Sequence, residues 1–162
     1  MGWLIPEITE SVIAAGKATG AAILVPGNVY PYETEPAPSS PGNPYRPDTP
    51  HRPVIRKARI RALMEATYRL AAETGGLRVI LLRGGDFLLL DAPQMLMNRV
   101  ILAKVTKGKV TAIGPADALH AYACLPDMAR AAADRAADAG HGVSAFHLHR
   151  CQRVLGTGAG TA

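Results

Sequence analysis

Two kinds of hydrophobic pattern alternate along the chain. Continuous apolar runs, typical of strands buried on both faces, occupy residues 21–25 and 77–83, and residues 143–149 alternate between apolar and polar as a strand does. Apolar residues at helical spacing separate these runs. The pattern predicts helices over 7–19, 54–73, 93–107 and 126–139, and short strands at 109–113 and 120–125. Strands separated by helices favour an α/β fold with a parallel sheet.

Turn-forming residues and side-chain spacing refine this prediction. Helix ends are expected at Gly20 and Gly75-Gly76, and turns are expected at Pro26-Gly27-Asn28 and Gly84-Gly85-Asp86-Phe87. The helix over 54–73 is expected to bury Ile60, Leu63, Met64, Thr67 and Ala71. Arg61 and Glu65 have the i,i+4 spacing of an ion pair, and Asp127 is predicted to cap the helix that follows it.

Most of the prolines lie within residues 31–53, which therefore cannot form a regular element. A loop of this length is either disordered or an excursion over a functional site. Because it leaves the carboxyl end of a strand, where ligands bind in open α/β sheets, we favour a loop on the substrate side.

Composition narrows the function classes. The net charge is +5, but six of the eighteen basic residues lie between Arg52 and Arg69, where a solvated helix face is favoured over a nucleic-acid surface. Two cysteines form no disulfide framework, and the N-terminus has no signal-peptide pattern. No apolar run is long enough to cross a membrane. We therefore expect a cytoplasmic protein that binds neither nucleic acid nor membrane.

Four segments, taken together and in order, resemble the C-terminal part of the NAD(P)-dependent epimerase/dehydratase family, the extended or atypical branch of the short-chain dehydrogenase/reductases. The segments are KATGAAILVPGNVYPYE, RKARIRALMEA, LRVILLRGGDF and HAYACLPDMARA, and the resemblance spans roughly residues 8–149. It implies a partial Rossmann-like sheet over residues 1–150, with a disordered tail at 151–162. It also implies an oxidoreductase or epimerase acting on a small hydroxyl/carbonyl or nucleotide-sugar-type substrate.

The resemblance implies catalytic residues at particular positions. The family's Ser or Thr falls at or near Pro26, and the Tyr of its Tyr-x-x-x-Lys motif falls on Pro53, while Lys57 matches the Lys that holds the nicotinamide ribose. The candidate catalytic residues are therefore Lys57 and, as a substitute proton donor, Tyr30. Tyr32 and Tyr45 are alternative substitutes.

The same resemblance implies NAD or NADP as cofactor, contacted by Gly27, Asn28, Lys57, Gly84, Gly85, Asp86 and Phe87. The glycines there either admit a ligand or simply form tight turns. A Gly-x-Gly-x-x-Gly loop does not occur before residue 27, and the glycines of GTGAG near the C-terminus have no helix after them. Cofactor binding by this chain alone is therefore expected to be weak.

Three interpretations stay open: the substrate-side half of an NAD(P)-dependent enzyme, weak or inactive alone; a non-catalytic dinucleotide-binding module; and a truncated, inactive family member. In the family, further strands continue the sheet beside residues 21–25, so a homodimer or a pairing partner is expected to cover this edge. His147, His149 and Cys151 share a strand face, but no second ligand cluster accompanies them, and no metal site is predicted.

Overall fold

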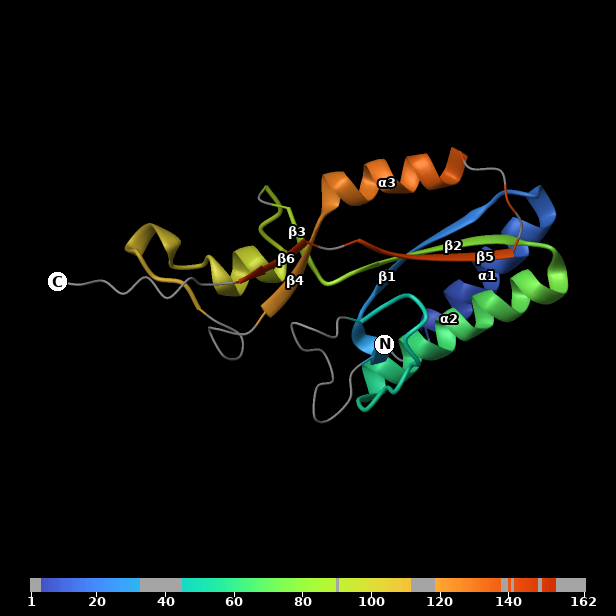
Figure 1. Cartoon of the computed structure of the whole chain (residues 1–162), viewed down its shortest axis with the longest axis horizontal. Coiled ribbons are helices and arrows are strands. Elements are labelled where there is room, and N and C mark those ends of the chain that lie inside the picture. Colours follow the sequence, from blue (N-terminus) through green and yellow to red (C-terminus); the bar gives the residue numbers. More distant parts are fainter. Residues whose placement is uncertain are drawn as a thin grey trace.

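A three-stranded parallel sheet forms the centre of the computed structural model, which describes residues 4–32, 45–89, 91–111, 119–137, 140, 142–148 and 150–153. The strands are β1 (Ile23–Asn28), β2 (Arg78–Gly84) and β5 (Gly142–Leu148). Their order is β1-β2-β5, with β2 paired in parallel to both neighbours (Figure 1). The predicted parallel sheet is confirmed.

Helices cover both faces of this sheet. α1 (Leu4–Thr19) and α2 (Arg56–Gly75) lie on one face, and α3 (Leu125–Ala137) lies on the other (Figure 1). The left-handed backbone at Gly20 and Gly76 ends the first two helices, as their sequence predicts. No helix in the described part of the chain combines the length and the apolar character that a membrane span requires.

The central strand β2 supplies both hydrophobic cores. Val79 and Leu81 face α1 and α2, whereas Ile80 and Leu82 pack beneath α3 with Met128. Each of these four β2 side chains is at most 1% exposed. Full burial of such a side chain contributes about 1.5–3 kcal/mol, so β2 anchors the three layers.

A second, smaller sheet lies beside the carboxyl ends of β2 and β5. Its strands are β3 (Asp86–Leu88), β4 (Leu119–Cys124) and β6 (Arg150–Arg153), in the order β3-β4-β6. β3 runs parallel to β4, whereas β6 runs antiparallel to it. β6 therefore carries regular structure three residues into the segment expected to be a tail.

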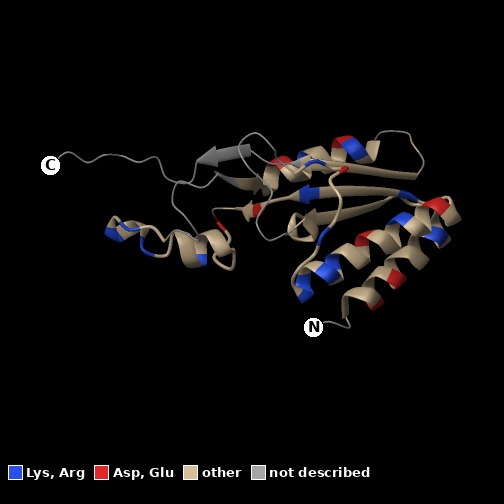
Figure 2. Cartoon of the chain, turned by 60° about the horizontal axis from the view of Figure 1, so that its bottom comes forward, with Lys and Arg blue, Asp and Glu red and all other residues tan. Residues whose placement is uncertain are grey.

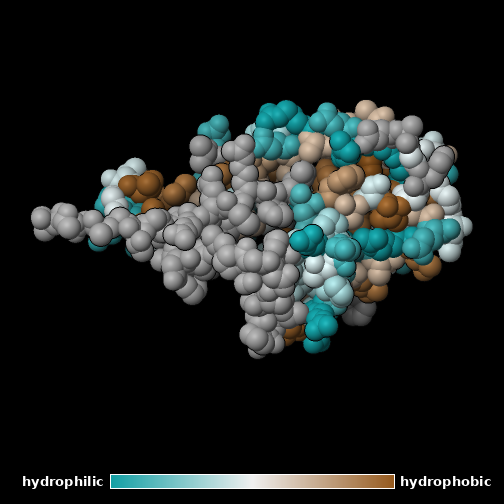
Figure 3. Space-filling view, in the orientation of Figure 1, coloured by the Kyte–Doolittle hydropathy of each residue, from teal (hydrophilic) through white to brown (hydrophobic). Residues whose placement is uncertain are grey.

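Residues 91–111 project from the second sheet, away from α1 and α2 (Figure 1, yellow). They contain a π-helical turn (Met97–Ile101) and a 3-10 turn (Val105–Lys107). The prediction of one helix over 93–107 is therefore wrong, and residues 109–111 form no strand. Apolar side chains are exposed along this projection (Figure 3), at Leu96, Val100, Val105 and Val110.

Several predicted turns are continuations of strands. Pro26-Gly27-Asn28 extends β1, because the parallel register with β2 runs through to Asn28. Gly84 ends β2, and Asp86 and Phe87 belong to β3, so the predicted turn is reduced to Gly85. Pro26 is tolerated because β1 is an edge strand of the described sheet.

The predicted buried face of α2 also needs correction. Leu63, expected to be buried, is 59% exposed, while Glu65, expected to pair with Arg61, is 1% exposed. Glu65 pairs with Arg83 rather than with Arg61, since α2 turns it toward the carboxyl edge of the sheet. Asp127 lies inside the first turn of α3, which begins at Leu125, so it does not cap that helix.

Candidate functional site

The carboxyl ends of β1, β2 and β5 meet at one edge of the central sheet, where open α/β folds bind their ligands. η1 (Tyr30–Tyr32) follows β1 there, and residues 45–55 return across the same edge into α2. Six polar or aromatic side chains converge at this point: Tyr32, Tyr45, His51, Glu65, Arg83 and His147. We call this group the edge cluster.

A buried ion pair lies at the centre of the edge cluster. Arg83 Nε donates to both carboxylate oxygens of Glu65, at 3.1 and 3.0 Å, and Nη2 donates to Oε2. Their side chains are 0% and 1% exposed. Burial lowers the pKa of Arg83, but the hydrogen bonds and charge of Glu65 more than offset this and raise it above its ordinary value. Arg83 therefore stays charged in spite of its burial.

His147 joins this ion pair to the loop. Its Nδ1 lies 3.0 Å from the carbonyl oxygen of Tyr45, and its Nε2 lies 3.1 Å from the hydroxyl of Tyr32 and 3.4 Å from Nη1 of Arg83. A carbonyl only accepts and a guanidinium only donates. The contacts therefore define a neutral His147 with its proton on Nδ1.

The aromatic rings of the cluster pack around Tyr32, which is 1% exposed. Tyr45 stacks on Tyr32 with ring centroids 5.1 Å apart, and His51 meets the same ring edge-on at 5.0 Å. Burial raises the pKa of Tyr32 and lowers the pKa of His51. Glu65, 3.6 Å from His51, acts against the shift in His51, while Arg83 and Arg69 add to it.

The structure brings together three of the residues predicted from the sequence. The ammonium of Lys57, in the first turn of α2, lies 4.3 Å from the centroid of the Tyr30 ring. Asn28 Oδ1 accepts a hydrogen bond of 3.1 Å from the backbone N–H of Tyr30 and so fixes the turn after β1. Lys57 is exposed and Tyr30 is half-buried, so both can be reached from solvent.

The predicted glycines are in close contact with protein atoms. A Cβ at Gly85 would lie 2.1 Å from the carbonyl oxygen of Ala121, and one at Gly84 would lie 2.7 Å from Ala123. At Gly27 it would lie 3.0 Å from Cγ of Arg83. These glycines admit β4 and the Arg83 side chain, while Asp86 and Phe87 pair with β4 as part of β3. The room that glycine leaves is therefore filled by the chain itself.

Sequence reasoning missed most of the edge cluster. Arg83 is the charged residue that ends the apolar run of β2, and this position is the signal that could have revealed it. Glu65 could have been recognised as its partner only with the tertiary structure. Tyr32 and Tyr45, the alternative candidates for proton transfer, stack on each other. Within the described residues, His, Cys, Asp and Glu side chains form no group suited to a metal ion.

The parallel sheet, its covering helices and a polar carboxyl edge define a partial Rossmann-like α/β fold. Solved structures that share this fold include sugar-nucleotide enzymes, several of them in complex with NAD. A dTDP-glucose 4,6-dehydratase of Bacillus anthracis in complex with NAD is 14% identical, with a TM-score of 0.72 over 87% of this chain and 44% of that one. A UDP-N-acetylglucosamine 4-epimerase of Methanobrevibacter ruminantium is 16% identical, with a TM-score of 0.71 over 91% and 48%.

A third similar structure is the UDP-glucuronic acid 4-epimerase of Bacillus cereus with NAD, at 12% identity, a TM-score of 0.72 and coverage of 88% and 46%. The chain thus spans about half the length of these enzymes. Identities this low establish the fold alone. No family model matches the sequence, and no curated protein matches it either.

Proposed function

We propose that this chain is the substrate-side part of an NAD(P)-dependent epimerase/dehydratase-type enzyme. Its substrate class is a small hydroxyl/carbonyl compound or a nucleotide sugar, and the chain alone is weakly active or inactive. The observation that carries the proposal is the Tyr30–Lys57 pair at the carboxyl end of β1, on a fold shared with NAD-dependent sugar-nucleotide enzymes. The chain spans only about half of those enzymes, which supports an incomplete site.

Tyr30 is the proton-transferring residue in this proposal. Of the three tyrosines near the carboxyl edge, Tyr32 is buried with its hydroxyl on His147, and Tyr45 stacks against it. Tyr30 alone lies under a lysine ammonium. A phenol can act as a general acid or base, and the cation–π contact holds the Tyr30 ring beside Lys57.

Lys57 and Asn28 are the proposed contacts to the cofactor, NAD or NADP, together with the backbone of Gly27 and of Gly84–Phe87. The exposed ammonium of Lys57 suits ribose hydroxyls, but the side-chain spaces at Gly84 and Gly85 are filled by β4. The described residues therefore suit the cofactor only at the end of β1. When bound, the nicotinamide would supply hydride transfer.

Calorimetric titration of the whole chain with NADH and NADPH tests this proposal. We expect binding near the millimolar range, weakened several-fold by Lys57→Ala and unchanged by Lys107→Ala, which removes a lysine from the distant projection. Tyr30→Phe should retain binding, because the ring under Lys57 is kept. If wild type shows no binding up to millimolar cofactor, or if both lysine variants weaken it equally, the proposal is wrong.

We also propose a partner that covers the open edge of the sheet. In the described part of the chain, β1 pairs only with β2, which leaves the backbone groups of its other edge available to another strand. We further propose a cytoplasmic location, which the low cysteine content favours. A stable monomer in analytical ultracentrifugation at all concentrations would contradict a self-pairing edge.

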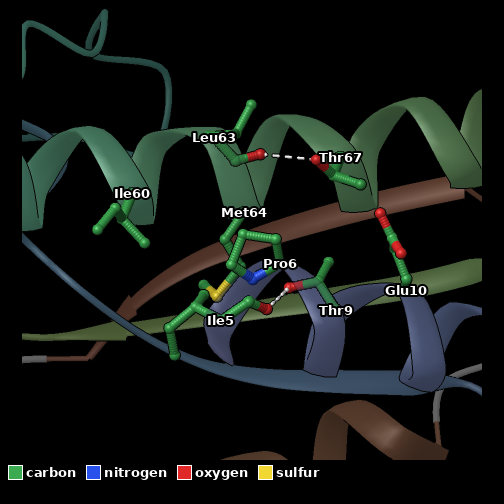
Figure 4. Close-up of a pocket in the computed structure, with 8 residues that line it drawn as sticks. All are labelled: Ile5, Pro6, Thr9, Glu10, Ile60, Leu63, Met64 and Thr67. Atoms are coloured by element: carbon green, nitrogen blue, oxygen red, sulfur yellow. Dashed lines mark hydrogen bonds between the residues drawn. The ribbon is translucent and has the colours of Figure 1, made fainter. Parts of the chain in front are cut away.

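A second surface, the outer face of α1 and α2, is also suited to a homodimer. A groove between the helices is lined by apolar and polar side chains (Figure 4), and Leu63 in its lining is 59% exposed. The lining residues are Ile5, Pro6, Thr9, Glu10, Ile60, Leu63, Met64 and Thr67. Acidic residues lie along α1 and basic residues at the start of α2 (Figure 2), so a two-fold arrangement would oppose unlike charges. Leu63→Lys should shift the sedimentation equilibrium toward monomer, whereas the exposed substitution Ala136→Lys should not.

A further inference from the structure

Residues 45–52 are fastened to the sheet by the edge cluster. The carbonyl of Tyr45 accepts from His147, and the carbonyl of Pro47 accepts from Nη1 of Arg83 at 3.2 Å. At the other end of the segment, the N–H of Arg52 donates to the carbonyl of Pro31 at 2.9 Å. The segment thus depends on residues of η1, β2 and β5 that lie far from it in the sequence.

Protonation of His147 would disrupt these contacts at Nε2. In the observed arrangement Nε2 accepts from the Tyr32 hydroxyl and faces the Arg83 guanidinium. An added proton would point a donor at Nη1, which is itself a donor, and would place a second cation next to Arg83. The contact from Nδ1 to the Tyr45 carbonyl tolerates the charged form, and the Tyr32 hydroxyl can turn to accept from Nε2, but the Arg83 guanidinium cannot accept.

The other charged groups around the segment do not compensate for such a proton. Glu65, the acidic residue facing the cluster, bonds to Arg83 through both oxygens and lies 3.6 Å from His51. It raises the pKa of His51, but burial and the nearby cations outweigh it and lower this pKa overall. The cations that act on His51 are Arg83 and Arg69, and both oppose its protonation, as does burial, which is the largest factor lowering its pKa. The hydroxyl of Tyr32 stays protonated, because burial raises its pKa.

We propose that residues 45–52 form a pH-sensitive latch, closed over the carboxyl edge of the sheet while His51 and His147 are neutral and opened by acidification. The Glu65–Arg83 pair stays in place in both states, and His51 and His147 are the groups that titrate. Opening would release residues 45–52 from Arg83 and His147, to which the carbonyl groups of Pro47 and Tyr45 are hydrogen-bonded. The latch rests on the cluster's geometry and does not depend on the cofactor proposal.

The direction of the pH effect follows from linkage. In the open state each histidine is solvated and has an ordinary pKa of about 6.5, whereas the closed state disfavours its proton. Protons therefore bind preferentially to the open state as the pH falls below this value. Between about pH 7.5 and about pH 5.5, opening should increase about tenfold if one histidine titrates and about a hundredfold if both do.

Hydrogen–deuterium exchange of the full chain measures this opening directly. After correction for intrinsic rates, we expect the protection of amides in residues 45–52 to fall by one to two orders of magnitude over that pH range. The amides of β2 should remain protected and serve as the internal control. In the double variant His51→Gln/His147→Gln, protection of the segment should no longer depend on pH.

Two results would overturn the latch. One is constant protection of residues 45–52 in wild type across this pH range, and the other is an unchanged pH dependence in the double variant. Should the variant unfold, the tautomer of His147 in wild type gives an independent test by nitrogen NMR. A neutral ring protonated on Nδ1 near pH 7.5, becoming doubly protonated on acidification, supports the latch, and a ring protonated on Nε2 near pH 7.5 contradicts it.

Discussion

The two sheets of this molecule are stabilised in different ways. The β1-β2-β5 sheet lies between helices on both faces and contains residues such as Leu81 at 0% exposure. The β3-β4-β6 sheet has short strands and carries a projection whose Val105 is 51% exposed. The first sheet is stabilised by hydrophobic burial on both faces, and the second depends on contacts with the first.

The contact between the sheets is narrow and specific. Gly84 at the end of β2 lies directly against Ala123 of β4, and the next residue, Gly85, lies against Ala121. α3 follows β4 and covers β2. Stability should therefore decrease from the centre of the β1-β2-β5 sheet toward the projection. The following substitutions test this gradient.

The largest effect is expected where charge is buried in the first sheet. Glu65→Ala should destabilise the protein by about 3–5 kcal/mol, because Arg83 would remain buried without its counter-ion. Urea unfolding followed by circular dichroism measures the loss. Arg130→Ala is the matched control, since it removes the exposed pair with Asp127, which should be worth less than about 1 kcal/mol. Equal effects of the two variants would contradict the buried pair.

A core truncation in the same sheet should come next. Leu81→Ala removes a fully buried side chain from the middle of β2 and should cost about 2–5 kcal/mol in urea unfolding. Val105→Ala, in the projection, should change stability by less than about 0.5 kcal/mol. If Val105→Ala were as destabilising as Leu81→Ala, the projection would be packed against something in solution.

These two positions also show what the sequence could predict. The apolar runs of β1 and β2 and the periodicity of α1 and α2 predict the parallel sheet, because burial on both faces requires continuous apolar residues. β3 and β6 are three and four residues long and carry no such pattern. The projection has helical periodicity but forms only short π and 3-10 turns.

The site was predictable only in part, for a related reason. Tyr30, Asn28 and Lys57 could be found because they adjoin recognisable segments at the end of β1 and the start of α2. The edge cluster joins residues as distant as Tyr32 and His147, 115 positions apart. Local patterns hold no information on such pairs, so the sequence predicts a pair between Glu65 and Arg61 and misses the pair between Glu65 and Arg83.

The junction between the sheets should give an intermediate effect. Gly85→Ala places a Cβ against the carbonyl oxygen of Ala121, and this overpacking should cost about 1–3 kcal/mol. Hydrogen exchange should lose protection in β4 before β2, because β4 must move away. Gly140→Ala, where no atom lies within 4 Å of the new Cβ, should leave exchange unchanged. Uniform loss of protection in both sheets would mean that they unfold as one unit.

The smallest effect is expected where β2 holds the far end of α3. The Arg78 guanidinium donates to the carbonyl oxygens of Arg135 and Ala136, at 2.5 and 3.0 Å, and so satisfies acceptors that the end of the helix leaves open. Arg78→Ala should cost about 1 kcal/mol and should raise hydrogen exchange only in the last turn of α3. Arg59→Ala, an exposed position in α2, controls for the loss of a positive charge. α3 follows β4 directly, so an increase in exchange that spread from α3 into β4 would show that α3 couples the two sheets. The decrease in stability from the first sheet to the second would then be smaller than their burial suggests.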